Sequence, residues 1–598
     1  MKRFLILIAL IGISFLVCQP ERDVALDLLD TQIGTTKIDD LSRTMDFMTS
    51  ERRFAQAEFE EKVASGLNRW AAETTLTKDG WAQDATVGDL LKEHSELVQV
   101  SQIDAVNYLN TDSYYVQQCQ WIKTLTNRIV TDKQIKGFEF YRLAADDFQV
   151  DPDSDSDALI DIVSKLNGTD EKQSEQLAQT LRAFDWIVRN IQLVDDVPES
   201  EEDREEARLY ESDNDWSSGI AGLGYQRHPW QTLLYSRGDY VDRAKLFILM
   251  AEELGLEAAM LTVDKDGEMM PWAVAVIIGD KKYLFDTQLG LPLPTKKIGE
   301  IGTLEMAQND AELLPNLKLS VDESLADNTT YWVTQEQAKK VATLLLVSPE
   351  SVSKRMWFLE NGLTGDARLN LAQSAEKLAG KFDNAKPWDI EFKTHLYRSA
   401  IRKAVKESGF IDQLKPKLTY HFTNEAYVDS FVLYRTARTK YFNGVFETEP
   451  NTVRKNAIEM FYILMYTDET ISMLATDTLV QRRQGILKDK NQSNNQFQSQ
   501  LSSVQGQMRL VRRDAGFFLA LTHFDNGNFV TAANWLRRMG EQEEVVRWKE
   551  GVEYLKGRSF ESSKEYDRAM EVYKNDDLLQ FHGNILRLRM LKELKDRS

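Results

Sequence analysis

The sequence predicts a mainly α-helical chain that contains one α+β domain, and two observations carry this prediction. Apolar residues recur at helical spacing along most of the 598 residues. Between residues 238 and 286, in contrast, they predict one buried helix followed by three short strands. A helix followed by neighbouring strands is typical of an α+β core.

The length and composition are sufficient for several domains. The chain is 42% hydrophobic and contains 12 Trp, so it can bury large apolar cores. We expect a signal sequence at residues 1–18, a helical N-terminal region at 19–160, the α+β domain at 161–320, a helical region at 321–510 and helical repeats at 511–598.

The N-terminus has the pattern of a signal peptide. Met1-Lys2-Arg3 is followed by an apolar run that ends at Val17 and is too short for a permanent membrane anchor. The segment around Cys18 loosely resembles a bacterial lipobox, although Phe15 and Val17 stand where Leu and a small residue are favoured. Either Cys18 is acylated or it lies near an ordinary cleavage site. Both alternatives predict export to the periplasm or cell envelope, with membrane contact only through a lipid anchor.

Charge and cysteine content exclude some classes of protein. The formal net charge of −21 repels phosphate backbones, so we expect no nucleic-acid partner. Cys119 is the only cysteine besides Cys18, so the mature chain has no intramolecular disulfide unless Cys18 stays unmodified. Because Cys119 lies in an apolar helical pattern beside Trp121, we expect a buried, inert thiol.

The N-terminal region is predicted to be helical, notably at 39–73 and at 114–130. An acidic tract follows at 151–157, with aspartates at alternate positions. A calcium loop of the EF-hand kind would need Gly and Glu where Ser156 and Ile162 stand, so we interpret the tract as a solvated linker and keep calcium as the alternative. No other pattern indicates a metal or a cofactor.

The central segment begins with a predicted amphipathic helix at 174–191. Residues 238–255 predict a second helix that is apolar nearly all round and ends at Gly255, as expected of a buried central helix. Strands are expected at 258–263, 272–278 and 283–286, with a turn at 279–282 between the last two.

This segment resembles the transglutaminase-like family, whose signature runs G-x-C-x-D-x-A, a helix, a strand, H-x-W and a strand ending in D-x-T. Gly238, Asp242, Ala244 and Asp286-Thr287 match that signature. The resemblance covers residues 174–295, about a fifth of the chain. It implies a papain-like α+β fold with a Cys-His-Asp site.

The catalytic positions of that signature are degenerate. Tyr240 stands at the position of the cysteine, and Pro271 at the position of the histidine. Only the orienting acid remains, as Asp286. A phenol and a proline ring cannot replace a thiolate and an imidazole in covalent acyl transfer. The resemblance therefore implies a transglutaminase-like domain with no catalytic residues.

A displaced active site is the alternative. His228 lies upstream of the central helix and could pair with Asp239 or Asp242, with the hydroxyl of Tyr240 as nucleophile and Asp286 nearby. The competing interpretation makes His228 an exposed loop residue beside Pro229 and Trp230, and makes Asp242 and Asp286 capping or hydrogen-bonding groups.

The second half is predicted to be helical, for example at 335–346, 391–407 and 425–441. Two helix-turn-helix stretches at 514–539 and 548–574 resemble tetratricopeptide repeats, and 434–465 is a looser copy. Small and bulky residues recur at equivalent places: Ala520, Gly527, Ala532, Leu536; Gly557, Phe560, Ala569, Tyr573; Ala437, Gly444, Ala457. An irregular helical bundle is the alternative. Basic residues of the final helix, Arg587 and Arg589 among them, are interpreted as ordinary C-terminal helix cations.

Three hypotheses for function follow from these patterns. The first is an exported, non-enzymatic scaffold of the cell envelope that binds a protein or peptide partner through its helical repeats. The second is a hydrolase or acyltransferase that uses the displaced site. The third is a structural building block that self-associates.

Overall fold

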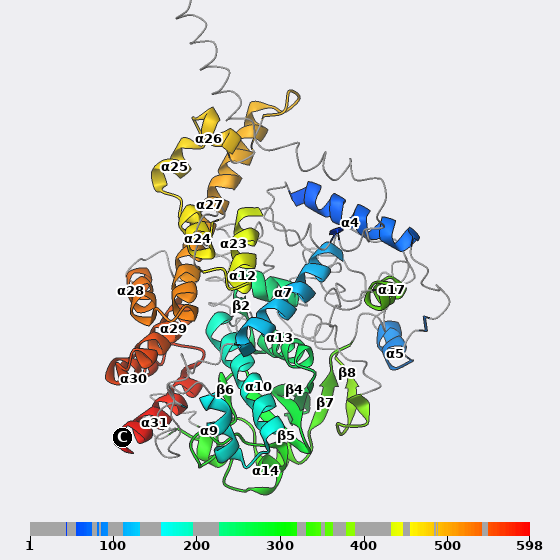
Figure 1. Cartoon of the computed structure of the whole chain (residues 1–598), viewed down its shortest axis with the longest axis vertical. Helices are drawn as coiled ribbons and strands as arrows, with labels where there is room; N and C mark the ends of the chain where they lie inside the picture. The colour runs from blue at the N-terminus through cyan, green and yellow to red at the C-terminus, as the bar shows by residue number, and fades with distance from the viewer. Residues whose placement is uncertain are drawn as a thin grey trace, which may run out of the picture.

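The structure, a computed structural model, describes residues 43–44, 56–73, 81–82, 85–93, 112–131, 141, 157–194, 227–319, 330–347, 353–362, 378–388, 432–446, 455–483, 486, 488–540 and 548–597 (Figure 1). These residues are mainly helical, with a small mixed sheet. The signal sequence with Cys18, the acidic tract up to residue 156 and the helix expected at 391–407 lie outside the described residues.

The main sheet has six strands in the order β6-β5-β4-β3-β7-β8. Their bounds are β3 (Glu257–Lys265), β4 (Glu268–Ile278), β5 (Lys281–Asp286), β6 (Leu291–Pro292), β7 (Ala342–Leu345) and β8 (Ala385–Pro387). All neighbours are antiparallel except β7 and β8. The three strands predicted from the sequence are β3, β4 and β5. Because β7 and β8 follow residue 320, the sheet extends past the expected end of the α+β domain.

The predicted helix at 335–346 is wrong. Only α15 (Gln335–Ala338) is helical there, and the chain then continues as β7. Residues 342–344 pair with residues 260–262 of β3, and the apolar side chains of Leu344 and Leu345 are buried. A short apolar run is compatible with either a helix or a strand. Here the free edge of β3 is available for pairing, so the run forms a strand.

Each face of the sheet packs against a different layer. On one face, Phe285 of β5 meets Phe247 of α13 (Tyr240–Glu253) and Phe184 of α10 (Glu171–Asn190), with ring centroids 5.0–5.2 Å apart. On the opposite face, Leu284 joins a second cluster that contains Tyr331 and residues of α14 (Leu304–Asn309). This alternation follows from the two-residue period of a strand.

A β-bulge interrupts the pairing of β3 with β4. Leu261 pairs with Ala273, but the next residue of β3, Thr262, pairs with Pro271. Trp272 is therefore the extra residue of the bulge, and its indole lies with Ala273 in the cluster on the face away from α13.

Helices α10 and α13 occupy the centre of the molecule. Both were predicted, and a two-stranded parallel pair connects the end of α10 to the start of α13: β1 (Gln192–Leu193) and β2 (Arg237–Gly238). Asp170 caps the N-terminus of α10 by accepting the N–H of Gln173, 2.8 Å away. Nearly every residue of α13 is buried, which explains its all-round apolar pattern.

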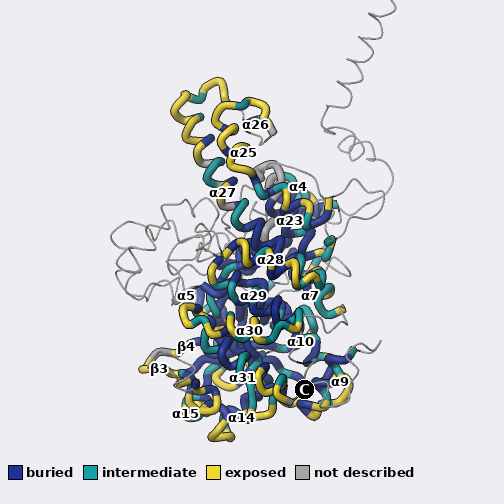
Figure 2. The backbone as a smooth tube through the Cα atoms, turned by 90° about the vertical axis from the view of Figure 1, so that its left-hand side faces the viewer, coloured by how far each residue is buried: buried dark blue, intermediate teal, exposed yellow. Residues whose placement is uncertain are grey.

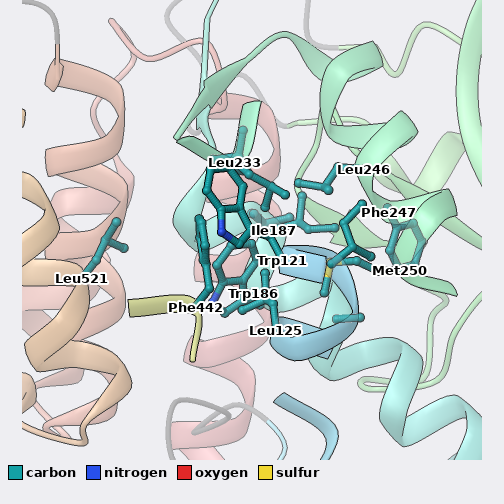
Figure 3. Close-up of a cluster of buried hydrophobic side chains, with 14 of the residues drawn as sticks. Trp121, Leu125, Trp186, Ile187, Leu233, Leu246, Phe247, Met250, Phe442 and Leu521 are labelled. Atoms are coloured by element: carbon teal, nitrogen blue, oxygen red, sulfur yellow. The ribbon is translucent and has the colours of Figure 1, made fainter. Parts of the chain in front are cut away.

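One continuous core joins regions that are far apart in the sequence. Figure 3 shows it at the point where Trp121 of α7 (Asp112–Thr131), Trp186 of α10 and Phe442 of α23 (Val432–Phe442) meet side chains of α12 (Pro229–Tyr235) and α13. The remaining described helices before residue 500 are α4 (Gln56–Glu73), α5 (Ala85–Glu93), α9 (Ala158–Asn167), α17 (Lys354–Gly362), α24 (Ala457–Leu464), α25 (Asp468–Met473) and α26 (Thr478–Arg483).

The C-terminal part is a series of helices that pack on their neighbours in sequence. They are α27 (Asn494–Asp525), α28 (Phe529–Gly540), α29 (Lys549–Ser562), α30 (Tyr566–Tyr573) and α31 (Phe581–Arg597). Gly557 of α29 faces the buried ring of Tyr573 in α30, so the absent side chain lets the two helices approach closely. Both predicted helix pairs are present, although the first helix of the first pair, α27, begins at Asn494 and not near residue 514.

One part of this series projects from the body. Helices α25 and α26 and the first half of α27 form an arm that is largely exposed (Figures 1 and 2). The rest of α27 and helices α28–α31 run along one side of the α+β core (Figure 1). Within the residues that the structure describes, no helix is both long and apolar enough to span a bilayer.

Candidate functional site: a degenerate triad

The first position of the triad that the resemblance implies lies at the start of α13. Asp239 caps the helix by accepting the N–H groups of Val241 and Asp242, both 2.8 Å away, and Asp242 accepts the N–H of Asp239 in return at 3.3 Å. Tyr240 is the first helical residue. The positive end of the helix would lower the pKa of a thiol at this position and favour the thiolate. Tyr240 has no thiol, so this activation does not apply.

The second position lies in β4, where Pro271 pairs with Thr262. Thr262 is two residues from Met260, which packs on the α13 side of the sheet, so Pro271 occupies that side as well. The structure thus places Pro271 and the start of α13 on the same side of the sheet. A proline ring has no group that can accept or donate a proton there.

The third position, Asp286, faces away from the other two. Phe285 packs on the α13 side, so the next side chain of β5 points to the opposite face. There its carboxylate accepts the hydroxyl of Tyr331 at 2.6 Å, and Tyr331 in turn accepts the indole N–H of Trp272 at 2.7 Å. The backbone N–H groups of Gln288 and Leu289 also donate to it, each at 2.9 Å.

The surroundings of Asp286 alter its acidity. The side chain is fully buried, and burial raises the pKa of this carboxyl to about 6, against the opposing effect of its three donors. The next residue, Thr287, binds the start of α13 instead: its hydroxyl donates to the backbone oxygen of Tyr240 at 2.6 Å. The end of β5 therefore contacts α13 through Thr287. Asp286 instead forms its side-chain hydrogen bond with Tyr331 on the other face of the sheet.

The residues of the displaced site are only partly brought together. Asp242 accepts the backbone N–H of Arg227 at 3.1 Å and its guanidinium at 3.3 Å, and His228 follows Arg227 in the chain. The expectation that His228 is exposed is wrong: it is 3% exposed and begins α12, with its own N–H donated to Gln231. Its neighbour Trp230 packs into the core, and this explains the burial.

Arg227 forms an ion pair with Asp242, and Tyr331 on the opposite face of the sheet donates a hydrogen bond to Asp286. A general base needs a carboxylate or imidazole with access to substrate, and these two acids are engaged in other contacts. Cys119 offers no substitute nucleophile. It is buried in α7 as expected, and burial raises the pKa of its thiol well above the usual value.

Sequence reasoning missed a set of buried arginines at the contact between the core and the C-terminal helices. Arg243 of α13 has no acidic partner among the described residues and donates to backbone oxygens of Ile191, Val188 and Thr287 and to the side chain of Gln580. Gln580 directly precedes α31. Arg243 therefore ties the triad region to the final helix.

Two further ion pairs fasten α10 to the C-terminal helices. Asp185 accepts Arg558 of α29 at 2.7 Å, and Arg189 donates to Asp525 of α27 at 2.8 Å. Asp185 and Arg189 also form an ion pair with each other at 2.7 Å. Their i,i+4 spacing is the only feature of these three pairs that the sequence itself could indicate. Partners more than 300 residues away leave no such signal.

In the described part of the chain, no group of three or more His, Cys, Asp or Glu side chains is arranged to hold a metal ion. Comparison of the chain with protein-family models, curated proteins and solved structures finds no match.

Proposed function

We propose that this chain is an exported, non-enzymatic protein of the cell envelope that acts as a scaffold for a protein or peptide partner. In this proposal residues 161–320 are a transglutaminase-like domain without catalytic residues, and helices α27–α31 are tetratricopeptide-like repeats.

The observation that carries the proposal is the direction of Asp286. Acyl transfer of the ancestral kind needs a nucleophile, a base and an acid on one side of the sheet. Here Tyr240 and Pro271 occupy two of the positions, and the acid is hydrogen-bonded to Tyr331 on the opposite face. These contacts support a structural role for Asp286.

The helical part supports the binding role. Stacked helix pairs present an extended surface, and such surfaces bind partners by shape. The arm formed by α25, α26 and the first half of α27 carries exposed apolar residues, including Leu479 (62% exposed) and Met473 (38%). Val530 at the start of α28 is 60% exposed. Exposed apolar side chains on a projecting arm are candidate contacts for a partner.

Site-specific photo-crosslinking tests the scaffold role in producing cells. A photoreactive residue at position 479 should trap a discrete protein or peptide. The matched control is position 269, where an equally apolar side chain, Met269, is 39% exposed on the β3–β4 hairpin. The identified partner should bind the purified chain and bind Leu479→Asp at least tenfold more weakly. Equal trapping at both positions, or equal binding by Leu479→Asp, would contradict the role of the arm.

Export and lipidation are tested by fractionation and fatty-acid labelling. The proposal expects the chain in the envelope fraction. Labelling that disappears in Cys18→Ser would establish a lipid anchor, and an unlabelled chain outside the cytoplasm would establish ordinary signal cleavage. Recovery of the uncleaved chain from the cytoplasm would contradict the exported scaffold.

A further inference from the structure

A cavity lies where the α+β core meets the last helix. It is formed by α10, the β5–β6 connection, the loop after β6 and α31, and it is a partly open cavity with a volume of about 50 Å³. Apolar side chains make up most of its wall: Leu181, Phe184, Leu291, Pro292, Ile301 and Met590. Three charged residues also line it: Asp185 of α10, Arg587 of α31 and Glu300 in the loop after β6.

Arg587 is the end of a ladder of alternating charges. The ladder continues from the pair Asp185–Arg558 described above: Arg558 lies 3.7 Å from Glu561, and Arg587 donates to both oxygens of Glu561 at 2.8 and 2.6 Å. The side chain of Arg587 is only 10% exposed and that of Glu561 is fully buried. The expectation that Arg587 is an ordinary surface cation of a helix end is therefore wrong.

Among the described residues, the ladder has one more arginine than it has acids. At its other end Asp525 also meets Arg128 at 3.5 Å, so the full set holds four arginines and three acids: Arg128, Arg189, Arg558, Arg587, Asp185, Asp525 and Glu561. Burial would raise the pKa of each acid, but the arginines hold the pKa of all three below the usual range. All three acids are therefore ionised at neutral pH.

One nitrogen of Arg587 remains for a ligand at the cavity. Arg587 uses Nε and Nη2 for Glu561, and its third nitrogen, Nη1, makes no hydrogen bond within the part of the chain that the structure describes. Glu300 also lines the cavity, but it is partly exposed and its Oε2 already accepts the hydroxyl of Thr295 at 2.7 Å. Water screens its charge more than that of a buried group.

We propose that this cavity binds a small monocarboxylate with an apolar body, whose carboxylate meets Nη1 of Arg587 and whose carbon chain lies against the apolar wall. Guanidinium groups bind carboxylates through short, charge-assisted hydrogen bonds. The remaining nitrogen of one guanidinium matches one carboxylate, and the apolar wall disfavours a compact, strongly hydrated anion such as phosphate. The site is independent of the scaffold role.

Titration calorimetry of the full chain with sodium hexanoate tests this site. We expect a dissociation constant on the order of 1 mM, as is typical of a ligand with so few atoms. Hexylamine, with the same apolar body and the opposite charge, and inorganic phosphate, with charge and no apolar body, should each bind at least tenfold more weakly. Equal binding of either probe would overturn the proposal.

Three variants locate the binding. Met590→Trp fills the cavity and leaves every charge in place, so it should abolish hexanoate binding. Arg587→Lys keeps the positive charge but loses the several N–H donors of the guanidinium, and should weaken binding about tenfold. Its matched control is Arg589→Lys in the same helix, where the guanidinium meets backbone oxygens of Asn316 and Lys318 outside the cavity, and binding should be unchanged. Thermal unfolding checks that each variant is folded.

The variants give clear outcomes. If Arg587→Lys does not fold, because Glu561 loses its partner, Met590→Trp still decides the question. Unchanged hexanoate binding in Met590→Trp, or the same loss in Arg589→Lys as in Arg587→Lys, would overturn the assignment of the cavity.

Discussion

Replacing Asp286 by Asn should change how the stability of the protein depends on pH. Burial raises the pKa of Asp286 from 3.8 to about 6, so the folded state binds this proton more tightly than the unfolded state does. The stabilising effect of that proton is complete below the unfolded pKa and is lost as the pH rises through about 6. Asparagine keeps the shape but cannot ionise.

The size of the effect follows from the two pKa values. For an acid with these values in the unfolded and folded states, ionisation lowers the free energy of unfolding by about 1.4 kcal/mol between about pH 5 and about pH 8. The wild-type protein should lose that amount relative to Asp286→Asn over this interval. The variant also differs from the wild type by a constant amount of about 1–3 kcal/mol, because an amide replaces the protonated carboxyl next to Tyr331, and this part does not vary with pH.

Urea unfolding of both proteins across this interval measures the difference. Asp280→Asn, which removes an exposed carboxylate from the turn between β4 and β5, is the control and should show no comparable slope relative to the wild type. A stability difference between wild type and Asp286→Asn that stays constant with pH would refute the reasoning, because it would mean that Asp286 is not buried against Tyr331.

Two other predictions concern packing. Gly557→Ala should destabilise the protein by about 1–3 kcal/mol, because a β-carbon there overlaps the buried ring of Tyr573, whereas Gly540→Ala, with no atom closer than 4.0 Å, should cost nothing measurable in the same thermal unfolding assay. Equal effects of the two changes would contradict the close approach of α29 and α30. In a Cys18→Ser background, Cys119 should react with a thiol reagent far more slowly in the native protein than in urea, and equal rates would contradict its burial.

Sequence patterns predicted the elements whose signals are local. The helix at 238–255 is α13, and the strands after it are β3, β4 and β5, because their apolar periods and turn residues lie within one short stretch. The helix pairs at 514–539 and 548–574 are likewise present. The strand at 342–345 was missed, because its partner is β3, about 80 residues earlier. Nothing local distinguishes that apolar run from a helix.

The residues at the candidate site could be predicted from the sequence, but the side of the sheet to which Asp286 points could not. The sequence alone indicates that Tyr240 and Pro271 cannot perform acyl transfer. It does not indicate that Asp286 points away from them, since this depends on strand phase and on Tyr331, which lies 45 residues later. The burial of His228 likewise depends on core contacts of the adjacent helix.

The charge ladder could not be predicted from the sequence. Its arginines and acids look like ordinary solvated residues, and their partners are brought together only by tertiary packing. Arg558 and Asp185, for example, are 373 residues apart. Only the spacings of Asp185 with Arg189 and of Arg558 with Glu561 are local. Buried ion pairs of this kind specify a contact between elements more than they stabilise it, because removal from water costs much of the Coulombic gain.

A turnover assay tests the central claim most directly. The purified chain, alongside Tyr240→Phe and His228→Ala, is incubated with a glutamine-containing peptide and an amine donor, and both crosslinked and hydrolysed products are measured by mass spectrometry. Because Tyr240 and Pro271 stand at the expected nucleophile and base positions and Asp286 is bound to Tyr331 on the other side of the sheet, we predict no product above the buffer blank for any of the three proteins. Turnover by the wild-type chain that disappears in either folded variant would contradict the account.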